Sequence, residues 1–179
     1  GIQDQVFTAL SGINLLEIKN SSWSVKKLCK PSYSEFIQNH AVLIPVNKAL
    51  RNDYGIDIQS NVLKDKMLNK YRTSLIKITA KGINAFMDLD LEAVAYYTQK
   101  SWKLKSQLKG VMNSEILTME KKLLDRGALG IRLIGAGGGG FFIVWGTKDF
   151  ISEIRDDPKL KALNINISNT GVAEMRVHL

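Results

Sequence analysis

The sequence is poor in the residues that build disulfides and metal sites. It has one cysteine, Cys29, and two histidines, His40 and His178. A single cysteine excludes an internal disulfide, and these three residues alone cannot complete a four-ligand zinc site. No apolar run reaches the roughly 18 residues that cross a bilayer, and the first ten residues lack the basic and apolar regions of a signal peptide. We therefore expect a cytoplasmic protein, and we assign no metal ligand.

Acidic residues are in the minority. Lysine and arginine number 25 against 17 aspartates and glutamates, which gives a formal net charge of +8. This surplus favours anionic partners, such as nucleic acid, phosphorylated metabolites or an acidic membrane surface, without choosing among them. The ordinary interpretation of each basic group is a solvated helix face. One group lies between residues 64 and 81, and the other consists of Lys100, Lys103, Lys105 and Lys109.

Length and composition are those of an ordinary globular domain. The chain has 179 residues, of which 45% are hydrophobic and 23% charged, so it can bury a core without disulfides or metals. Pro45 indicates an edge strand or a strand end, because proline cannot donate to the ladder. Gly127 stands where a left-handed residue would end a helix. We predict one α+β domain over residues 1–179, with a mainly antiparallel sheet backed by helices.

Apolar spacing and turn residues predict the individual elements. Helices are expected over residues 3–10, 60–86, 91–108, 114–126 and 148–154. Strands are expected over residues 13–18, 23–28, 41–46, 131–134, 141–145, 164–167 and 173–178. Pro31 is expected to close the hairpin of the first two strands, and residues 47–59 are expected to form a polar loop.

The most informative string is GAGGGG, at residues 135–140, with five glycines in six positions. It satisfies the spacing G-x-G-x-x-G, but a dinucleotide site requires a helix after the loop, and the following FFIVW is typical of a strand. A Walker phosphate loop is excluded too, since no Gly-Lys-Ser/Thr follows. Glycine loses the most conformational entropy on folding, so a cluster of glycines is destabilising unless the backbone needs unusual dihedral angles or a close approach. Two explanations remain open: a sharp hairpin packed against another backbone, or a loop that brings N–H groups to a phosphate or sugar.

Three segments resemble motifs of the GHMP kinases, a superfamily that includes galactokinases, homoserine kinases, mevalonate kinases and phosphomevalonate kinases. Residues 127–142, GALGIRLIGAGGGGFF, resemble its third motif. Residues 1–18, GIQDQVFTALSGINLLEI, are similar to the segment around its catalytic aspartate. Trp102 and Lys105 are similar to the W-x-x-K of heptose kinases. The segments occur in family order, and the subgroup that the chain resembles most is the D-glycero-D-manno-heptose phosphate kinases.

The resemblance implies a transferase of carbohydrate metabolism, a kinase that uses ATP to phosphorylate a hydroxyl of a sugar or sugar phosphate. The residues that it assigns are Asp4 for catalysis, Gly135, Gly137, Gly138, Gly139 and Gly140 for the phosphate and substrate loop, and Arg51, Trp102 and Lys105 for substrate binding.

The same resemblance implies that this chain is the C-terminal, substrate-side part of such a kinase. The family's P-x-x-x-G-L-G-S-S loop, which cradles ATP, does not occur in it, so residues 1–30 would be the end of a preceding lobe. ATP and Mg²⁺ would be bound mainly by that lobe, and the chain alone is expected to be inactive. The expected partners are the sugar substrate, ATP and the lobe, and neither a membrane nor nucleic acid is expected.

The sequence also departs from the family pattern. Ile131-Arg132 stands where the family usually has Gly-Lys, and only Arg51 matches a T-G-x-x-R segment. Each functional assignment also has a structural alternative. The alternative for Asp4 is a helix N-terminal acid stabilised by the helix dipole. For Lys105 it is a stem lying along the core with its ammonium in water, and for Arg51 it is a solvated side chain.

A second function class stays open on the charge alone. It is a non-catalytic basic module that binds nucleic acid or other anions, and aromatic residues interleaved on an exposed sheet would support it. Phe141, Phe142 and Trp145 fit a buried strand better. Retention on heparin or DNA that falls steeply with salt would favour this class over a kinase.

Overall fold

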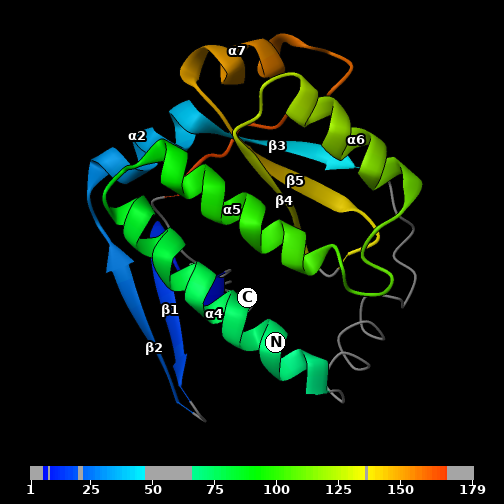
Figure 1. Cartoon of the computed structure of the whole chain (residues 1–179). Helices are drawn as coiled ribbons and strands as arrows, with labels where there is room; N and C mark the ends of the chain where they lie inside the picture. The colour runs from blue at the N-terminus through cyan, green and yellow to red at the C-terminus, as the bar shows by residue number, and fades with distance from the viewer. Residues whose placement is uncertain (1–5, 8, 20–21, 47–65, 136, 169–179) are drawn as a thin grey trace, which may run out of the picture. The chain divides into compact units, whose positions relative to one another are not determined.

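The structure, a computed structural model, describes residues 6–7, 9–19, 22–46, 66–135 and 137–168 (Figure 1). It divides into two compact units. Residues 1–37 and 166–179 belong to the first unit, and residues 38–165 belong to the second. The strands are antiparallel and occur together with helices, so the predicted α+β class is confirmed.

The first unit contains a two-stranded antiparallel ladder, as predicted. β1, Ile13–Lys19, pairs with β2, Ser22–Leu28, and Lys19 faces Ser22 at the turn. Directly before β1, the N–H of Gly12 donates to the carbonyl of Ser168 at 2.8 Å. Of the helix predicted over residues 3–10, residues 6, 7 and 9 are described and are helical, and residues 3–5 and 8 lie outside the described residues.

The sequence analysis missed a helix after this ladder. α2, Pro31–His40, begins at the proline that was expected only to close the hairpin. Proline suits the first helical position, because its fixed φ is helical and its missing N–H would have no partner there. Tyr33 and Phe36, one turn apart, are its buried residues. A proline followed by this spacing is the signal that identifies the helix.

The second unit is built on a three-stranded antiparallel sheet in the order β3-β5-β4. β3, Ala41–Val46, pairs with β5, Gly140–Trp145, and β5 pairs with β4, Gly130–Ile134. β3 is therefore an edge strand of this sheet, as Pro45 predicts. The strand that follows the glycine string is the middle one, so the loop at residues 135–140 joins two neighbouring strands.

Four helices lie wholly within the described part of the second unit. They are α4, Lys66–Met87, α5, Leu91–Lys105, α6, Ser114–Asp125, and α7, Lys148–Asp156. α4 and α5 lie side by side, and α5 runs along β4 (Figure 1). The last three helices each begin at a polar residue whose side chain accepts a backbone N–H, which satisfies a donor that the helix leaves unpaired. These residues are Asp90, Asn113 and Thr147.

The end of α6 confirms the stop predicted at Gly127. Gly127 has a φ of +103°. Its N–H donates to the carbonyl of Leu124, and the N–H of Ala128 donates to that of Leu123, both at 3.0 Å. This pair of bonds is the usual way in which a left-handed glycine closes a helix. The reversal sends the chain directly into β4.

The strand predicted over residues 164–167 is wrong. Only Leu163 pairs with the sheet, through two backbone bonds with Leu43 of 3.0 and 2.8 Å, and residues 164–168 form no strand. In the register of this bridge, residues 164 and 165 would lie opposite Val42 and Ala41, the first two residues of β3, so the ladder has little room to extend before the end of α2. The strand predicted over residues 173–178 lies outside the described residues.

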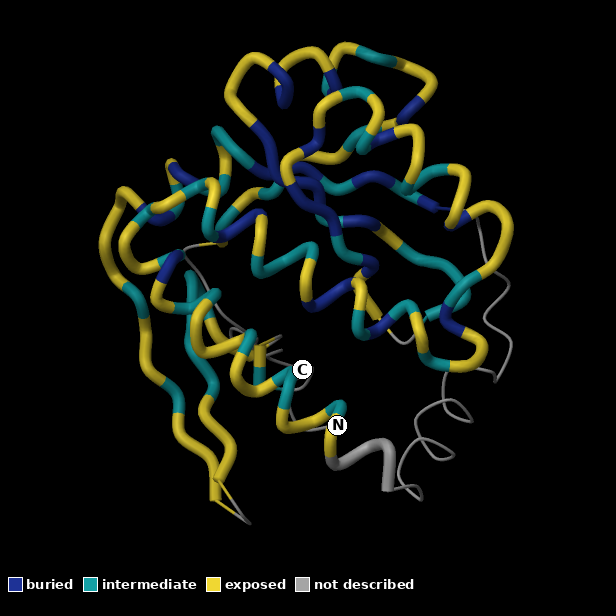
Figure 2. Tube along the Cα trace, viewed as in Figure 1, coloured by how far each residue is buried: buried dark blue, intermediate teal, exposed yellow. Residues whose placement is uncertain are grey.

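The core of the second unit lies between the sheet and its helices, and the buried parts of the trace follow the strands (Figure 2). Its large, fully buried side chains come from all three strands and from α5, α6 and α7. They include Ile44, Trp102, Ile116, Leu123, Ile131, Leu133, Phe142, Ile151 and Ile154.

Candidate functional site

The glycine loop lies between β4 and β5, directly after the pair formed by Ile134 and Phe141. Four of its glycines have φ between +75° and +133°, in the region where other residues are strained. These are Gly135, Gly137, Gly138 and Gly140. The cluster therefore exists because the backbone needs these conformations.

The loop is also packed against the segment that joins α5 to α6. Gly138 donates its N–H to the carbonyl of Val111 at 3.0 Å. The side-chain amide of Asn113 donates to the carbonyl of Gly138, also at 3.0 Å. A Cβ on Gly137 would lie 2.9 Å from the Cα of Val111, so only glycine fits there without a shift. The same Asn113 caps α6, because its side-chain oxygen accepts the N–H of Ile116 at 2.9 Å.

Helix α5 satisfies the edge of β4 that β5 leaves open. The N–H of Ile131 donates to the side-chain oxygen of Gln99 at 2.8 Å. The ammonium of Lys105 donates to the carbonyl of Leu133 at 3.1 Å, and it donates to the carbonyl of Gly135 as well. Two polar side chains of one helix thus cover an edge that would otherwise present unpaired backbone groups.

Lys105 is 7% exposed, so its ammonium does not extend into water as the structural alternative supposed. Burial, with a smaller contribution from the nearby positive charge of Arg132, lowers its pKa from 10.5 to about 8. Burial likewise lowers the pKa of the Arg132 guanidinium. Tyr71 of α4 lies near Arg132, and burial raises the pKa of this phenol. Lys105 and Arg132 thus place two basic groups close to each other beside β4.

Trp102 belongs to the core of the second unit. Its ring is fully buried and meets the ring of Phe142 edge to face, with 5.5 Å between centroids. Its indole N–H is buried and has no hydrogen-bond partner among the described residues. The role of Trp102 in substrate binding stays a prediction.

Two of the predicted site residues, Asp4 and Arg51, lie outside the described residues. Gly139 is described and has no positive φ. Of the predicted site residues, the structure brings together Lys105 and Gly135. Within the described ranges, no group of three or more histidine, cysteine, aspartate or glutamate side chains is placed to hold a metal ion. No helix in the same ranges is long and apolar enough to cross a membrane.

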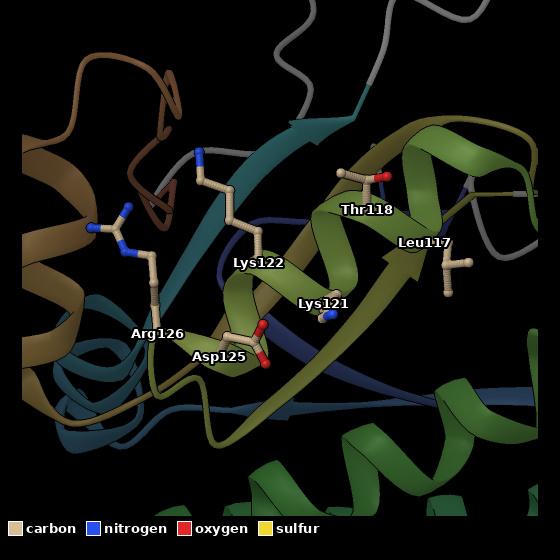
Figure 3. Close-up of a pocket in the computed structure, with 6 residues that line it drawn as sticks. All are labelled: Leu117, Thr118, Lys121, Lys122, Asp125 and Arg126. Atoms are coloured by element: carbon tan, nitrogen blue, oxygen red, sulfur yellow. The ribbon is translucent and has the colours of Figure 1, made fainter.

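A separate hollow of about 630 Å³ lies on the outer side of α6 (Figure 3). Its lining residues, all from this helix and its C-cap, are Leu117, Thr118, Lys121, Lys122, Asp125 and Arg126. Arg126 at its end is held by Asp157 and Glu153, at 2.5 and 2.8 Å. None of the predicted site residues lines this hollow.

The basic stretches largely form solvated helix faces, as predicted. Their described members on α4 and α5 are exposed, with Lys105 as the exception. Of the three aromatic residues of β5, Phe142 and Trp145 are buried, and Phe141 is 39% exposed. The strand therefore does not present the row of exposed aromatics that a nucleic-acid platform uses.

The sequence analysis missed two residues that bind backbone groups, Gln99 at β4 and Asn113 at the glycine loop. Gln99 lies one turn from Ala95 and from Trp102, so it is a polar side chain on the buried stripe of α5. Asn113 stands directly before Ser114-Glu115, a typical helix start. Both signals are visible in the sequence, but neither indicates which backbone group the side chain reaches.

Residues 80–159 match the family model of the GHMP kinases C terminal domain. No curated protein is significantly similar to the chain. Several solved structures have the same fold as this chain at low sequence identity. The L. major mevalonate kinase in complex with R-mevalonate has a TM-score of 0.66 and 16% identity, over 90% of this chain and 50% of its own.

Two further solved structures share the fold. A D-glycero-D-manno-heptose 1-phosphate kinase from Bacteroides thetaiotaomicron has a TM-score of 0.64 and 16% identity, over 100% of this chain and 50% of its own. The Methanococcus jannaschii mevalonate kinase has a TM-score of 0.60 and 22% identity, over 86% of this chain and 47% of its own. The chain thus spans about half the length of these kinases. The fold of the chain is thus similar to that of these kinases, and residues 80–159 match the C-terminal domain model of the GHMP kinases.

Proposed function

We propose that the protein containing this chain is a kinase that transfers the γ-phosphoryl group of ATP to a hydroxyl of a sugar or sugar phosphate. A heptose phosphate is the acceptor that the sequence motifs favour. The observation that carries the proposal is the glycine loop, which combines four positive-φ glycines with backbone and side-chain bonds to its neighbours. Such a loop can hold its N–H groups in a fixed arrangement around a phosphate.

In the proposed reaction, the carboxylate of Asp4 accepts the proton of the acceptor hydroxyl. The hydroxyl oxygen forms a bond to the γ-phosphorus, and the bond from that phosphorus to the bridging oxygen of ADP breaks. When bound, ATP would supply the phosphoryl group, and its Mg²⁺ would neutralise charge on the phosphate oxygens. The loop would donate N–H bonds to the phosphoryl oxygens, and Arg51 would pair with a phosphate of the acceptor.

We assign no magnesium ligand in this chain, because its described residues gather no suitable set of side chains. We propose instead that the ATP cradle and the metal ligands belong to a lobe whose last part is residues 1–30. The fact that the similar kinases are about twice as long supports this division. Localisation in the cytoplasm belongs to the same proposal, since ATP and phosphorylated sugars are found there.

The test is phosphotransfer by the intact protein that contains this chain, with ATP and Mg²⁺ and a panel of acceptors. A heptose phosphate, galactose and mevalonate represent the classes named in the similar structures. We expect the highest kcat/KM with the sugar phosphate. Turnover of mevalonate alone would overturn the acceptor class but keep the kinase. An inactive protein with all three would overturn the function.

The catalytic assignment has its own variant. Asp4→Asn in the intact protein should lower kcat by roughly 10²–10⁴ with little change in acceptor KM, because it removes the proton acceptor and keeps the side-chain size. Asp156→Asn is the matched control, since Asp156 is an exposed acid at the end of α7. Near-normal turnover of Asp4→Asn would return Asp4 to the role of a helix N-terminal acid.

A further inference from the structure

Lys105 was assigned to substrate binding by resemblance, but its observed bonds lead into the protein. Two of its three N–H donors are used by the carbonyls of Leu133 and Gly135. The first carbonyl belongs to the residue before the last one of β4, and the second belongs to the first residue of the glycine loop. A buried ammonium with two carbonyl partners fixes the backbone that carries them, because both charge-assisted bonds must be kept or the charge is left unpaired.

The loop is held at a second place, three residues further on. The carbonyl of Gly138 accepts from the side-chain amide of Asn113 at 3.0 Å, while the N–H of Gly138 donates to Val111. A trans peptide directs its carbonyl and its N–H to opposite sides. The N–H of Gly139 therefore points away from Asn113, and it has no hydrogen-bond partner among the described residues.

These two anchors matter because a run of glycines has little conformational preference of its own. Each unrestrained residue costs about 1–2 kcal/mol of backbone entropy when it is fixed, and glycine costs the most. Donors that are fixed before the ligand arrives stabilise transferring charge better than donors that must be ordered at that moment.

We infer that Lys105 and Asn113 are positioning residues, which hold the glycine loop in one conformation by binding the carbonyls of Leu133, Gly135 and Gly138. The inference rests on the proposed phosphotransfer at this loop. It gives Lys105 a role that acts through the loop, in place of direct contact with the substrate.

The fold provides a matched control for Lys105. Gln99 lies on the same helix and caps the same edge of β4, but its partner is Ile131, at the far end of the strand from the loop. Lys105→Met and Gln99→Met each replace a capping side chain by an unbranched apolar one of similar length. Both remove bonds from the β4 edge, and only the first removes a bond from the loop.

The kinetic test uses the intact protein. Lys105→Met should lower kcat about tenfold or more, because displaced donors lose transition-state stabilisation, while acceptor KM changes by less than about threefold. Gln99→Met should leave both parameters within about twofold of wild type. A rise in acceptor KM with unchanged kcat would show that Lys105 is a substrate ligand. An equal loss of kcat in both variants would show a general effect of stability, and either result overturns the inference.

Asn113→Asp is a second variant that is expected to fold. Aspartate caps a helix as well as asparagine does, so the bond to the N–H of Ile116 is kept, but the donor to Gly138 is lost. We expect a loss of kcat in the same direction as for Lys105→Met. Wild-type turnover by Asn113→Asp would overturn its role in positioning.

A readout without activity separates this inference from the proposed function. Amide hydrogen exchange of residues 137–140 should be about tenfold faster in Lys105→Met and Asn113→Asp than in wild type and Gln99→Met. If the wild-type protein transfers no phosphate, the proposed function fails, and the exchange rates still decide whether these residues hold the loop. Equal exchange in all four proteins overturns the inference.

Discussion

The two ends of the β4–β5 hairpin both depend on glycine, but for different physical reasons. At the open end, Gly130 and Gly146 do not have left-handed φ values, and they have no space for a side chain. A Cβ on Gly130 would lie 2.1 Å from the carbonyl oxygen of Ala95 in α5. One on Gly146 would lie 2.2 Å from the ring of Phe150. These glycines allow a helix to approach the sheet closely.

At the loop end the requirement is conformational. Gly135 has a φ of +89°, and a Cβ there would have no atom within 4 Å; Gly138 has a φ of +75°, and its Cβ would lie 3.7 Å from the carbonyl oxygen of Gly110. Space is available at both positions, so the backbone shape alone requires glycine. The comparison teaches that one end of the hairpin is fixed by packing and the other by dihedral angles. The loop glycines thus permit a backbone shape that other residues would adopt only with strain.

The largest effect is expected at the packed end. Gly130→Ala should lower the free energy of unfolding by about 3 kcal/mol or more, because its methyl group meets the backbone of α5 and cannot be accommodated by a rotamer change. Urea unfolding of the chain measures the loss. A decrease below about 1 kcal/mol would mean that α5 can move away from β4 at little cost.

The second prediction compares two loop positions. Gly137→Ala should cost roughly 2–3 kcal/mol of unfolding free energy, because it combines positive φ with a clash at the Cα of Val111. Gly135→Ala should cost only about 1–2 kcal/mol, since it has the strain without the clash. The same urea experiment tests both. Equal losses would show that contact with Val111 adds nothing to the conformational requirement.

Much of this contrast could be predicted from the sequence, because it depends on local signals. The position of the loop, the strands on both sides of it and the helices that begin at residues 91, 114 and 148 follow from periodicity and capping residues. The need for unusual dihedrals follows from five glycines in six positions. The missed helix α2 also had a local signal in Pro31, so that error was one of interpretation.

The remainder depends on contacts between residues far apart in the chain. The spacing of Trp102 and Lys105 predicts a shared helix face, but the ammonium binds carbonyls 28 and 30 residues away. Helical periodicity predicts which face of the helix a residue occupies, but it does not predict which backbone group of another element that residue contacts. The single bridge at Leu163 likewise depends on Leu43, more than a hundred residues earlier.

The third prediction concerns the buried charge that connects α5 to the loop. The pKa of Lys105 is lowered by burial and by Arg132 to about 8, below its ordinary value of 10.5. Between these values the unfolded chain binds more protons, so the free energy of unfolding should rise as pH increases from about 8 to 10, by about 1–2 kcal/mol. Lys105→Met should remove this rise. If the free energy of unfolding rises with pH equally in both proteins, the rise comes from groups other than Lys105.

The smallest effect tests a glycine of neither kind. Gly82 lies inside α4 without positive φ, and a Cβ there would meet the Cβ of Tyr97 at 3.4 Å, an ordinary contact. Alanine is the better helix former, so Gly82→Ala should raise the free energy of unfolding by about 0.5–1 kcal/mol. The expected change in unfolding free energy is therefore opposite in sign to the changes expected for alanine substitutions at both ends of the hairpin. A loss of stability would show that α4 and α5 are packed as tightly as α5 and β4, and that the close approach at Gly130 is a general property of the helix layer.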